Sequence, residues 1–364
     1  MKAFLCVFRA AVIGAVVIAQ IAVSPAHGPQ PQKAPPYKLS WYLHPQRLVD
    51  IGGRRLNILC TGKGSPAVIL EAGLIADASA WRWVQPAVSQ TTRVCSYDRA
   101  GLGFSDPAGP PRDAAAIVRD LHTLLANAGV APPYVLVGWS SGGLYTRLYQ
   151  YRYPREVAGL VEVDPDSEFE AADYGEKIVT SIMHKSRRWY DKQIQDWYAQ
   201  YDNCAVNVSR GTCFLFPGGL TTYRRRLREA GCPASSYAAC ALAEVRGEHL
   251  SRASLWKDEG LELKATPRDE VELRAAARPY GNLPLIVLTD SENKDVDASG
   301  PISVAAQRAT WIDKDKAEER VARLSTVGAH FVVANSPHAI QLYQPSVVIS
   351  AIYEVLDQAR YGRK

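Results

Sequence analysis

The stretch that decides the fold of this chain is Val135-Leu136-Val137-Gly138-Trp139-Ser140-Ser141-Gly142-Gly143. It opens with an apolar run typical of a buried strand, and residues 144–151 after it have the apolar spacing of a helix. Between them lies a Gly-x-Ser-x-Gly pattern, whose glycines let neighbouring segments approach closely while the serine side chain projects from the bend. The strand before the pattern and the helix after it predict a sharp turn that exposes Ser140.

Outward from this turn, short apolar runs alternate with helix-length segments. Strands are predicted at residues 67–70, 93–97, 134–137, 159–163, 285–288 and 331–333, after a hairpin formed by residues 47–51 and 54–60 around Gly52-Gly53. A helix is predicted at residues 112–128, where five apolar residues share one face. The alternation predicts the α/β class, with a doubly wound, mostly parallel sheet of eight strands.

The alternation stops between Ser167 and Arg278. We therefore predict a core formed by residues 47–166 and 279–364, with residues 167–278 inserted as a helical cap over the sheet edge. The insertion carries large side chains at near-helical spacing, namely Trp189, Tyr190, Ile194, Trp197, Tyr198 and Tyr201. These side chains either pack against the main body or line a substrate site, and the spacing does not choose between the two.

Residues 1–26 have the pattern of an export signal. Lys2 and Arg9 supply positive charge, residues 10–23 are nearly all apolar, and small residues precede a cleavage point near Ala26. Residues 27–46 form a proline-rich linker. The alternative is an N-terminal membrane anchor, but a spanning helix normally needs about 20 apolar residues and this run is shorter. We expect a periplasmic or secreted protein without stable membrane insertion once the signal is removed.

Cleavage would leave six cysteines: Cys60, Cys95, Cys204, Cys213, Cys232 and Cys240. An even number in an exported chain predicts disulfide bonds, although six cysteines allow 15 connectivities. Bonds between Cys204 and Cys213 and between Cys232 and Cys240 would each close a short loop. The alternative is that all six cysteines are buried thiols. A metal site is disfavoured because no Cys-x-x-Cys pair occurs.

Composition excludes some functions. The chain of 364 residues is 47% hydrophobic and 22% charged, a balance typical of a globular domain rather than a disordered segment. The net charge of +5 comes from 42 basic and 37 acidic residues, so the basic excess is small. No nucleic-acid partner is expected, because such binding needs a concentrated basic surface.

From Arg54 to about Tyr353 the sequence resembles the α/β-hydrolase fold superfamily, specifically bacterial serine hydrolases and esterases with Glu-Ala-Gly after the third strand. Four motifs in the order of the family carry the resemblance: residues 68–74 (VILEAGL), residues 97–105 (YDRAGLGFS), the turn at Ser140, and residues 336–342 (SPHAIQL). The resemblance implies an α/β-hydrolase sheet with a cap, and a serine nucleophile at position 140.

The serine requires a base, and a histidine is the usual one near neutral pH. His338 is favoured because it follows the last predicted strand, and the family places its histidine last in chain order. The sequence leaves open which acidic residue orients His338. Asp164 ends the sixth predicted strand, where backbone position is rigid. Asp290 and Asp295 follow the seventh strand, the usual place in the family, but the usual Gly-x-x-Asp turn is absent there. We predict Asp164, with Asp290 and Asp295 as alternates.

The resemblance also implies an oxyanion hole formed by the amides of Leu74 and Ser141. The sequence thus predicts a carboxylesterase that forms an acyl-enzyme on Ser140 and acts on a small-molecule acyl ester, without a metal or organic cofactor. The alternatives are a thioesterase, lactonase or acyltransferase on the same fold, or a non-catalytic ligand-binding protein. Nothing in the sequence determines the oligomeric state.

Overall fold

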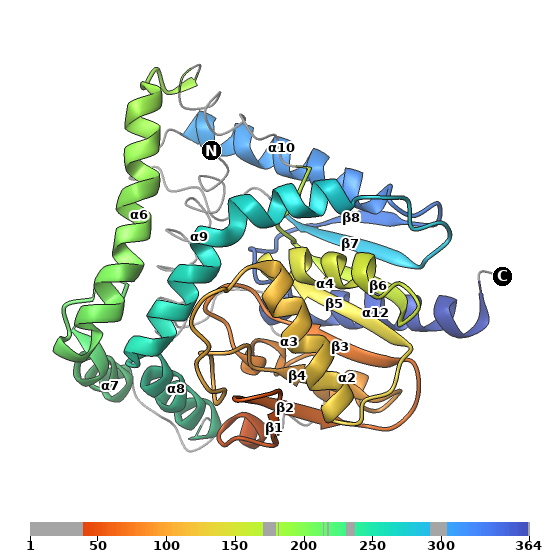
Figure 1. The fold of residues 1–364 in the computed structure, drawn as a ribbon, viewed down its shortest axis with the longest axis horizontal. Helices are drawn as coiled ribbons and strands as arrows, with labels where there is room; N and C mark the ends of the chain where they lie inside the picture. Colours follow the sequence, from red (N-terminus) through yellow and green to blue (C-terminus); the bar gives the residue numbers. More distant parts are fainter. Residues whose placement is uncertain are drawn as a thin grey trace.

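The computed structural model describes residues 39–169, 180, 182–213, 215–216, 218–230, 237–291 and 304–362. Within these residues one sheet of eight strands runs through the molecule in the order β1-β2-β4-β3-β5-β6-β7-β8 (Figure 1). The strands are β1 (Leu48–Asp50), β2 (Arg55–Thr61), β3 (Ala67–Glu71), β4 (Val94–Tyr97), β5 (Tyr134–Trp139), β6 (Val157–Val163), β7 (Leu285–Asp290) and β8 (Ala329–Val333).

The sheet is parallel from β4 to β8, and only the β1–β2 and β2–β4 pairings are antiparallel. This arrangement confirms the predicted eight-stranded, mostly parallel sheet and the hairpin at one edge. The predicted strands also match in position, because each apolar run is bounded by polar or turn-forming residues.

Helices cover both faces of the sheet. Alternate strand residues point to opposite faces, so Ile69 packs with α3 (Ala114–Asn127) and α4 (Ser141–Arg152), while Leu70 packs with α12 (Pro345–Tyr361) on the other side. Shorter helices α2 (Gln85–Val88) and α11 (Ile340–Tyr343) and the 3-10 turns η1 (Leu39–Tyr42) and η2 (Ala78–Trp81) complete the layers, with α10 (Val304–Ala322) beside β7 and β8. Asp113 begins α3 by accepting a hydrogen bond from the amide of Ala116 at 2.8 Å.

The described part of the segment between β6 and β7 is helical. It contains α6 (Arg187–Asn207), η4 (Val208–Arg210), α7 (Gly219–Ala230), α8 (Tyr237–Leu250) and α9 (Ala253–Ala276). In Figure 1, α6 stands away from the sheet and α9 runs from α6 and α8 toward the core, where it contacts α3 and α4. A helical segment beside the core is what the predicted cap requires. The limits of the cap at residues 167 and 278 stay a prediction.

The aromatic side chains of α6 pack into a second hydrophobic cluster. Ile194, Trp197 and Tyr201 are buried there with Trp256 and Leu263 of α9, and Trp189 and Tyr198 are partly buried against them. Packing therefore accounts for the buried members of the stripe, while the side chain of Tyr190 lies outside the described residues. The cluster also includes Ile75 and Leu102 of the core.

Two disulfide bonds occur among the described residues. Cys60 and Cys95 are register partners on β2 and β4 and are bonded to each other. Cys204 and Cys213 close the predicted short loop beside η4. Cys232 and the side chain of Cys240 lie outside the described residues, as do residues 1–38 with the predicted signal and most of the linker. Among the helices described, none has the length and apolar character to cross a membrane.

Candidate active site

Ser140 lies at the junction of β5 and α4. It has φ 56° and ψ −127°, a conformation that residues with side chains rarely adopt. Its amide donates to the carbonyl of Val163 at 3.2 Å, and its carbonyl accepts from the amide of Asp166 at 3.0 Å. These bonds to the end of β6 hold the serine in its strained turn, as expected where strain serves a function.

Glycines allow other segments to lie directly against this turn. A Cβ at Gly142 would lie 2.8 Å from the carbonyl oxygens of Glu71 and Ala72, and a Cβ at Gly73 would lie 2.9 Å from Cβ of Ser140. Any side chain at these positions would collide with its neighbours. The loop after β3 therefore passes against the serine at Gly73, the residue before Leu74, and the amide of Leu74 stays the predicted oxyanion donor.

His338 is hydrogen-bonded through Nδ1 to Oδ2 of Asp164. Its Nε2 is buried and has no hydrogen-bond partner among the described residues. The carbonyl of His338 accepts a hydrogen bond from Nε1 of Trp139 at 3.0 Å, and the two rings lie 5.3 Å apart. Because Trp139 directly precedes Ser140, this contact places His338 beside the strand end that carries the serine.

Asp164 is completely buried and has φ 46° at the end of β6. Its second oxygen, Oδ1, accepts the amide of Asp290 at 3.0 Å and contacts Nζ of Lys314. The Asp290 carboxylate itself binds Lys314, at 2.9 Å, rather than His338. Of the three predicted acids, the structure brings Asp164 to the histidine and Asp290 to a neighbouring lysine, while Asp295 lies outside the described residues.

Lys314 of α10 is a site residue that the sequence did not reveal. It lies 150 positions from Asp164 in the chain, within no recognisable motif, and only the packing of α10 on β7 joins them. Donor atoms of Asp164, Asp290 and His338 lie within 4.8 Å of one another, a spacing that could suit a metal ion. The Lys314 ammonium already contacts both carboxylates, however, so this donor set does not fit a metal centre.

Three other described histidines, His330, His249 and His184, lie in different surroundings. His330 of β8 contacts Oγ1 of Thr289 at 2.6 Å, and burial lowers its pKa. His249 packs edge-on against Phe104 and lies 3.6 Å from Asp77. His184 is exposed. These surroundings agree with the preference for His338 as the candidate base.

Comparisons with known proteins agree with this architecture. Residues 66–216 match a family model described as the alpha/beta hydrolase fold. An esterase of Thermogutta terrifontis superposes with a TM-score of 0.52 at 20% identity, covering 84% of this chain and 94% of the esterase. The enol-lactonase of Burkholderia xenovorans gives 0.52 at 16% identity, covering 84% and 97%. A Pseudomonas aeruginosa protein whose name refers to an epoxide hydrolase gives 0.55 at 16% identity, covering 86% and 96%. The chain thus has the α/β-hydrolase fold, and residues 66–216 are similar to that family's model.

Sequence relatives match shorter stretches. An uncharacterized protein of Schizosaccharomyces pombe is 41% identical over 100 residues, which cover 28% of this chain and 19% of that protein. An AB hydrolase superfamily protein of Gibberella zeae is 36% identical over 125 residues, covering 33% of this chain and 38% of that protein. The chain therefore matches well under half the length of these relatives.

Proposed function

We propose that the protein is a serine hydrolase that cleaves carboxylic esters through an acyl-enzyme on Ser140. The observation that carries the proposal is the buried hydrogen bond between Asp164 and His338, beside the strained turn that bears the serine. A buried carboxylate that accepts from Nδ1 holds the imidazole in the tautomer whose Nε2 can take a proton.

In the proposed reaction, His338 removes the proton of Ser140 as its Oγ attacks the ester carbonyl carbon. The amides of Leu74 and Ser141 donate to the oxyanion that forms, and each such donor typically contributes about 3 kcal/mol to transition-state stabilisation. Collapse of this intermediate expels the alcohol, which takes its proton from His338. Water then attacks the acyl-enzyme with His338 again as base, releasing the acid and restoring Ser140.

The substrate class is proposed as a small acyl ester. Two of the similar solved structures are an esterase and an enol-lactonase, and their names support this substrate class. Their low sequence identities to this chain show a shared fold alone. Epoxide hydrolases of this fold attack with an aspartate, so a serine at position 140 disfavours that chemistry. Thioester or lactone hydrolysis and acyl transfer would use the same acyl-enzyme, and a panel of acyl donors separates them.

The decisive test combines active-site labelling with a chain-length series of p-nitrophenyl esters. A fluorophosphonate should label Ser140, because its oxygen attacks phosphorus and fluoride leaves. Ser140→Ala should abolish labelling, and both Ser140→Ala and His338→Ala should lower kcat by at least about 1,000-fold. His330→Ala is the matched control and should stay within about threefold of wild type. A wild-type protein that is neither labelled nor active would instead indicate a non-catalytic ligand-binding protein.

Export is proposed as well, with residues 1–26 as a signal peptide and a membrane anchor as the alternative. The support is chemical, because the bonds Cys60–Cys95 and Cys204–Cys213 would persist in an oxidising compartment. Mass spectrometry of the protein recovered outside the cytoplasm would distinguish cleavage near Ala26 from retention of the segment.

A further inference from the structure

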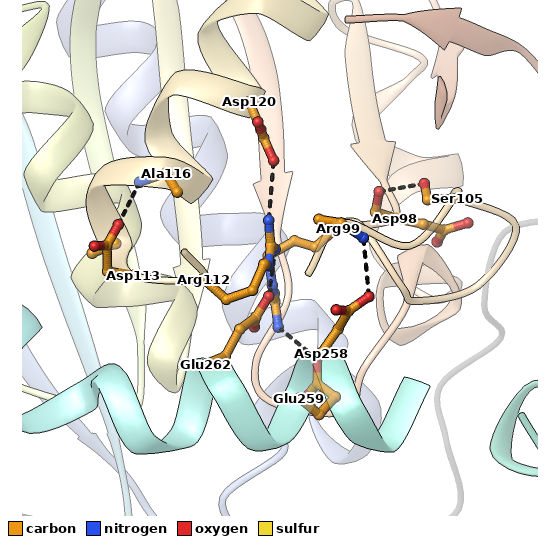
Figure 2. A network of polar contacts seen from close by, with 12 residues as sticks. Asp98, Arg99, Ser105, Arg112, Asp113, Ala116, Asp120, Asp258, Glu259 and Glu262 are labelled. Carbon is orange, nitrogen blue, oxygen red and sulfur yellow. Dashed lines mark hydrogen bonds and ion pairs between the residues drawn. The ribbon is translucent and has the colours of Figure 1, made fainter. Parts of the chain in front are cut away.

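A buried network of charges lies next to the loop that follows β3. Arg99 is 2% exposed and Glu259 and Glu262 of α9 are fully buried. Arg99 donates to Glu71 at 2.9 Å and to Glu262 at 3.0 Å, and Glu262 also accepts from Arg112 at 2.5 Å. Figure 2 shows Arg99, Arg112, Glu259 and Glu262 of this network, with Glu262 extending from α9 toward Arg112. The network thus joins a helix of the inserted segment to the core of the fold.

The network forms hydrogen bonds to the backbone on both sides of Leu74. On the near side, Arg99 donates to the carbonyl of Ala72 at 2.6 Å and to the carbonyl of Gly73 at 2.9 Å. On the far side, Oε2 of Glu259 accepts a hydrogen bond from the amide of Ile75. These contacts determine how the peptide groups flanking Leu74 are oriented.

The backbone of Ile75 shows that this loop is held in a strained conformation. Its φ is 52°, in the left-handed region, where a β-branched residue is strained. Such a conformation persists only where the surroundings enforce it. Glu259 supplies that constraint directly, since it binds the amide of the strained residue.

We propose that Glu259 is a positioning residue that sets the oxyanion-hole amide of Leu74 through its hydrogen bond to Ile75. This inference rests on the proposed function. It gives α9, a helix of the predicted insertion, a part in catalysis, because α9 carries the acceptor. Burial raises the pKa of Glu259, but a neutral carboxyl oxygen also accepts a hydrogen bond.

Oxyanion stabilisation is made in the transition state and not in the ground state, so the proposal predicts an effect on kcat rather than on KM. Glu259→Met removes the acceptor at similar side-chain length and should lower kcat roughly 10- to 100-fold, with KM changed less than about threefold. Glu259→Gln keeps an acceptor oxygen and should retain kcat within about fivefold. Should Glu259→Met fail to fold, Glu259→Asp replaces it, since the shorter carboxylate withdraws from Ile75 and should lower kcat similarly.

Asp258 offers a matched control on the same helix. It is equally buried and accepts the amides of Ala108 at 3.1 Å and Gly109 at 2.9 Å, on a different loop. Asp258→Asn and Asp258→Leu should reduce the melting temperature as the Glu259 variants do, yet leave kcat within about threefold. Equal kcat losses at both positions, or a Gln variant as slow as the Met variant, would overturn the proposal. If wild type is inactive and unlabelled, the proposed function fails and the inference falls with it.

Discussion

At the scale of single residues, the candidate site is built from groups held in conformations they would not adopt alone. Ser140, Asp164 and Ile75 all have positive φ, and each is fixed by hydrogen bonds to a neighbouring strand or helix. Asp164 uses Oδ2 for His338 and Oδ1 for the Asp290 amide and Lys314. A carboxylate bound on both oxygens cannot rotate away from the imidazole without losing these bonds.

The choice of acid is tested by neutral replacements. Asp164→Asn should lower kcat by about 1,000- to 10,000-fold, because an amide can present its NH2 to Nδ1 and favour the wrong tautomer of His338. Asp290→Asn should cost less than about tenfold, since that carboxylate contacts Lys314 instead. Steady-state kinetics on one p-nitrophenyl ester compares the two. A larger loss in Asp290→Asn, or in Asp295→Asn, would move the role of acid to that residue.

At the scale of elements, the antiparallel edge of the sheet is covalently tied to its parallel body. The bond between Cys60 and Cys95 links β2 to β4 across a separation of 35 residues, whereas Cys204 and Cys213 are 9 residues apart. A longer closed loop removes more entropy from the unfolded chain. The cross-strand bond should therefore contribute more to the stability of the fold.

Replacing Cys60 and Cys95 together with alanine should lower the free energy of unfolding by about 4 kcal/mol. The same change at Cys204 and Cys213 should cost about 2.5 kcal/mol. Urea unfolding of both variants, each compared with wild type, measures the difference. A smaller loss at the sheet edge than at the short loop would show that chain entropy does not govern these bonds.

At the scale of the whole molecule, several carboxyl groups are buried in the core beneath the site. Glu162 of β6 is fully buried, accepts from Thr146 at 2.9 Å and pairs with Arg147 at 3.3 Å. Burial raises the pKa of Glu162 to about 8 despite these partners. The folded state therefore binds a proton there at pH values where the unfolded chain does not.

This difference has a definite sign. Because the pKa of Glu162 is higher in the folded state, its protonation stabilises the folded protein. This contribution to the free energy of unfolding is complete below the unfolded pKa of 4.5 and is lost as the pH rises through about 8. Glu162→Gln, which cannot titrate, should flatten the decline in the free energy of unfolding between about pH 5 and pH 8. Chemical unfolding at several pH values measures both slopes. An unchanged slope in the variant would show that Glu162 is ionised in the folded protein at neutral pH.

Local sequence was enough for the strands and the turn at Ser140, and chain order selected His338 as the candidate base, a role that stays a prediction. Apolar runs, glycines and chain order depend on neighbouring residues, so they can be read without a structure. The described strands accordingly fall where the apolar runs predict them. The aromatic stripe of α6 was less informative, since spacing alone cannot say what a buried face packs against.

Tertiary structure decided which distant polar groups meet. Asp164 lies 174 positions before His338, Lys314 lies 150 positions after Asp164, and Glu259 lies 184 positions after Ile75. The sequence predicted Asp164 as the partner of His338 from its place at a strand end, with Asp290 and Asp295 as alternates. No pattern in the chain marks Lys314 or Glu259, because a buried charge is tolerated wherever packing supplies a partner and the identity of that partner depends on the whole fold. The sequence by itself thus determined the sheet and the turn that bears Ser140, the proposed nucleophile. The packing of α9 and α10 determined which charged groups lie beside that turn.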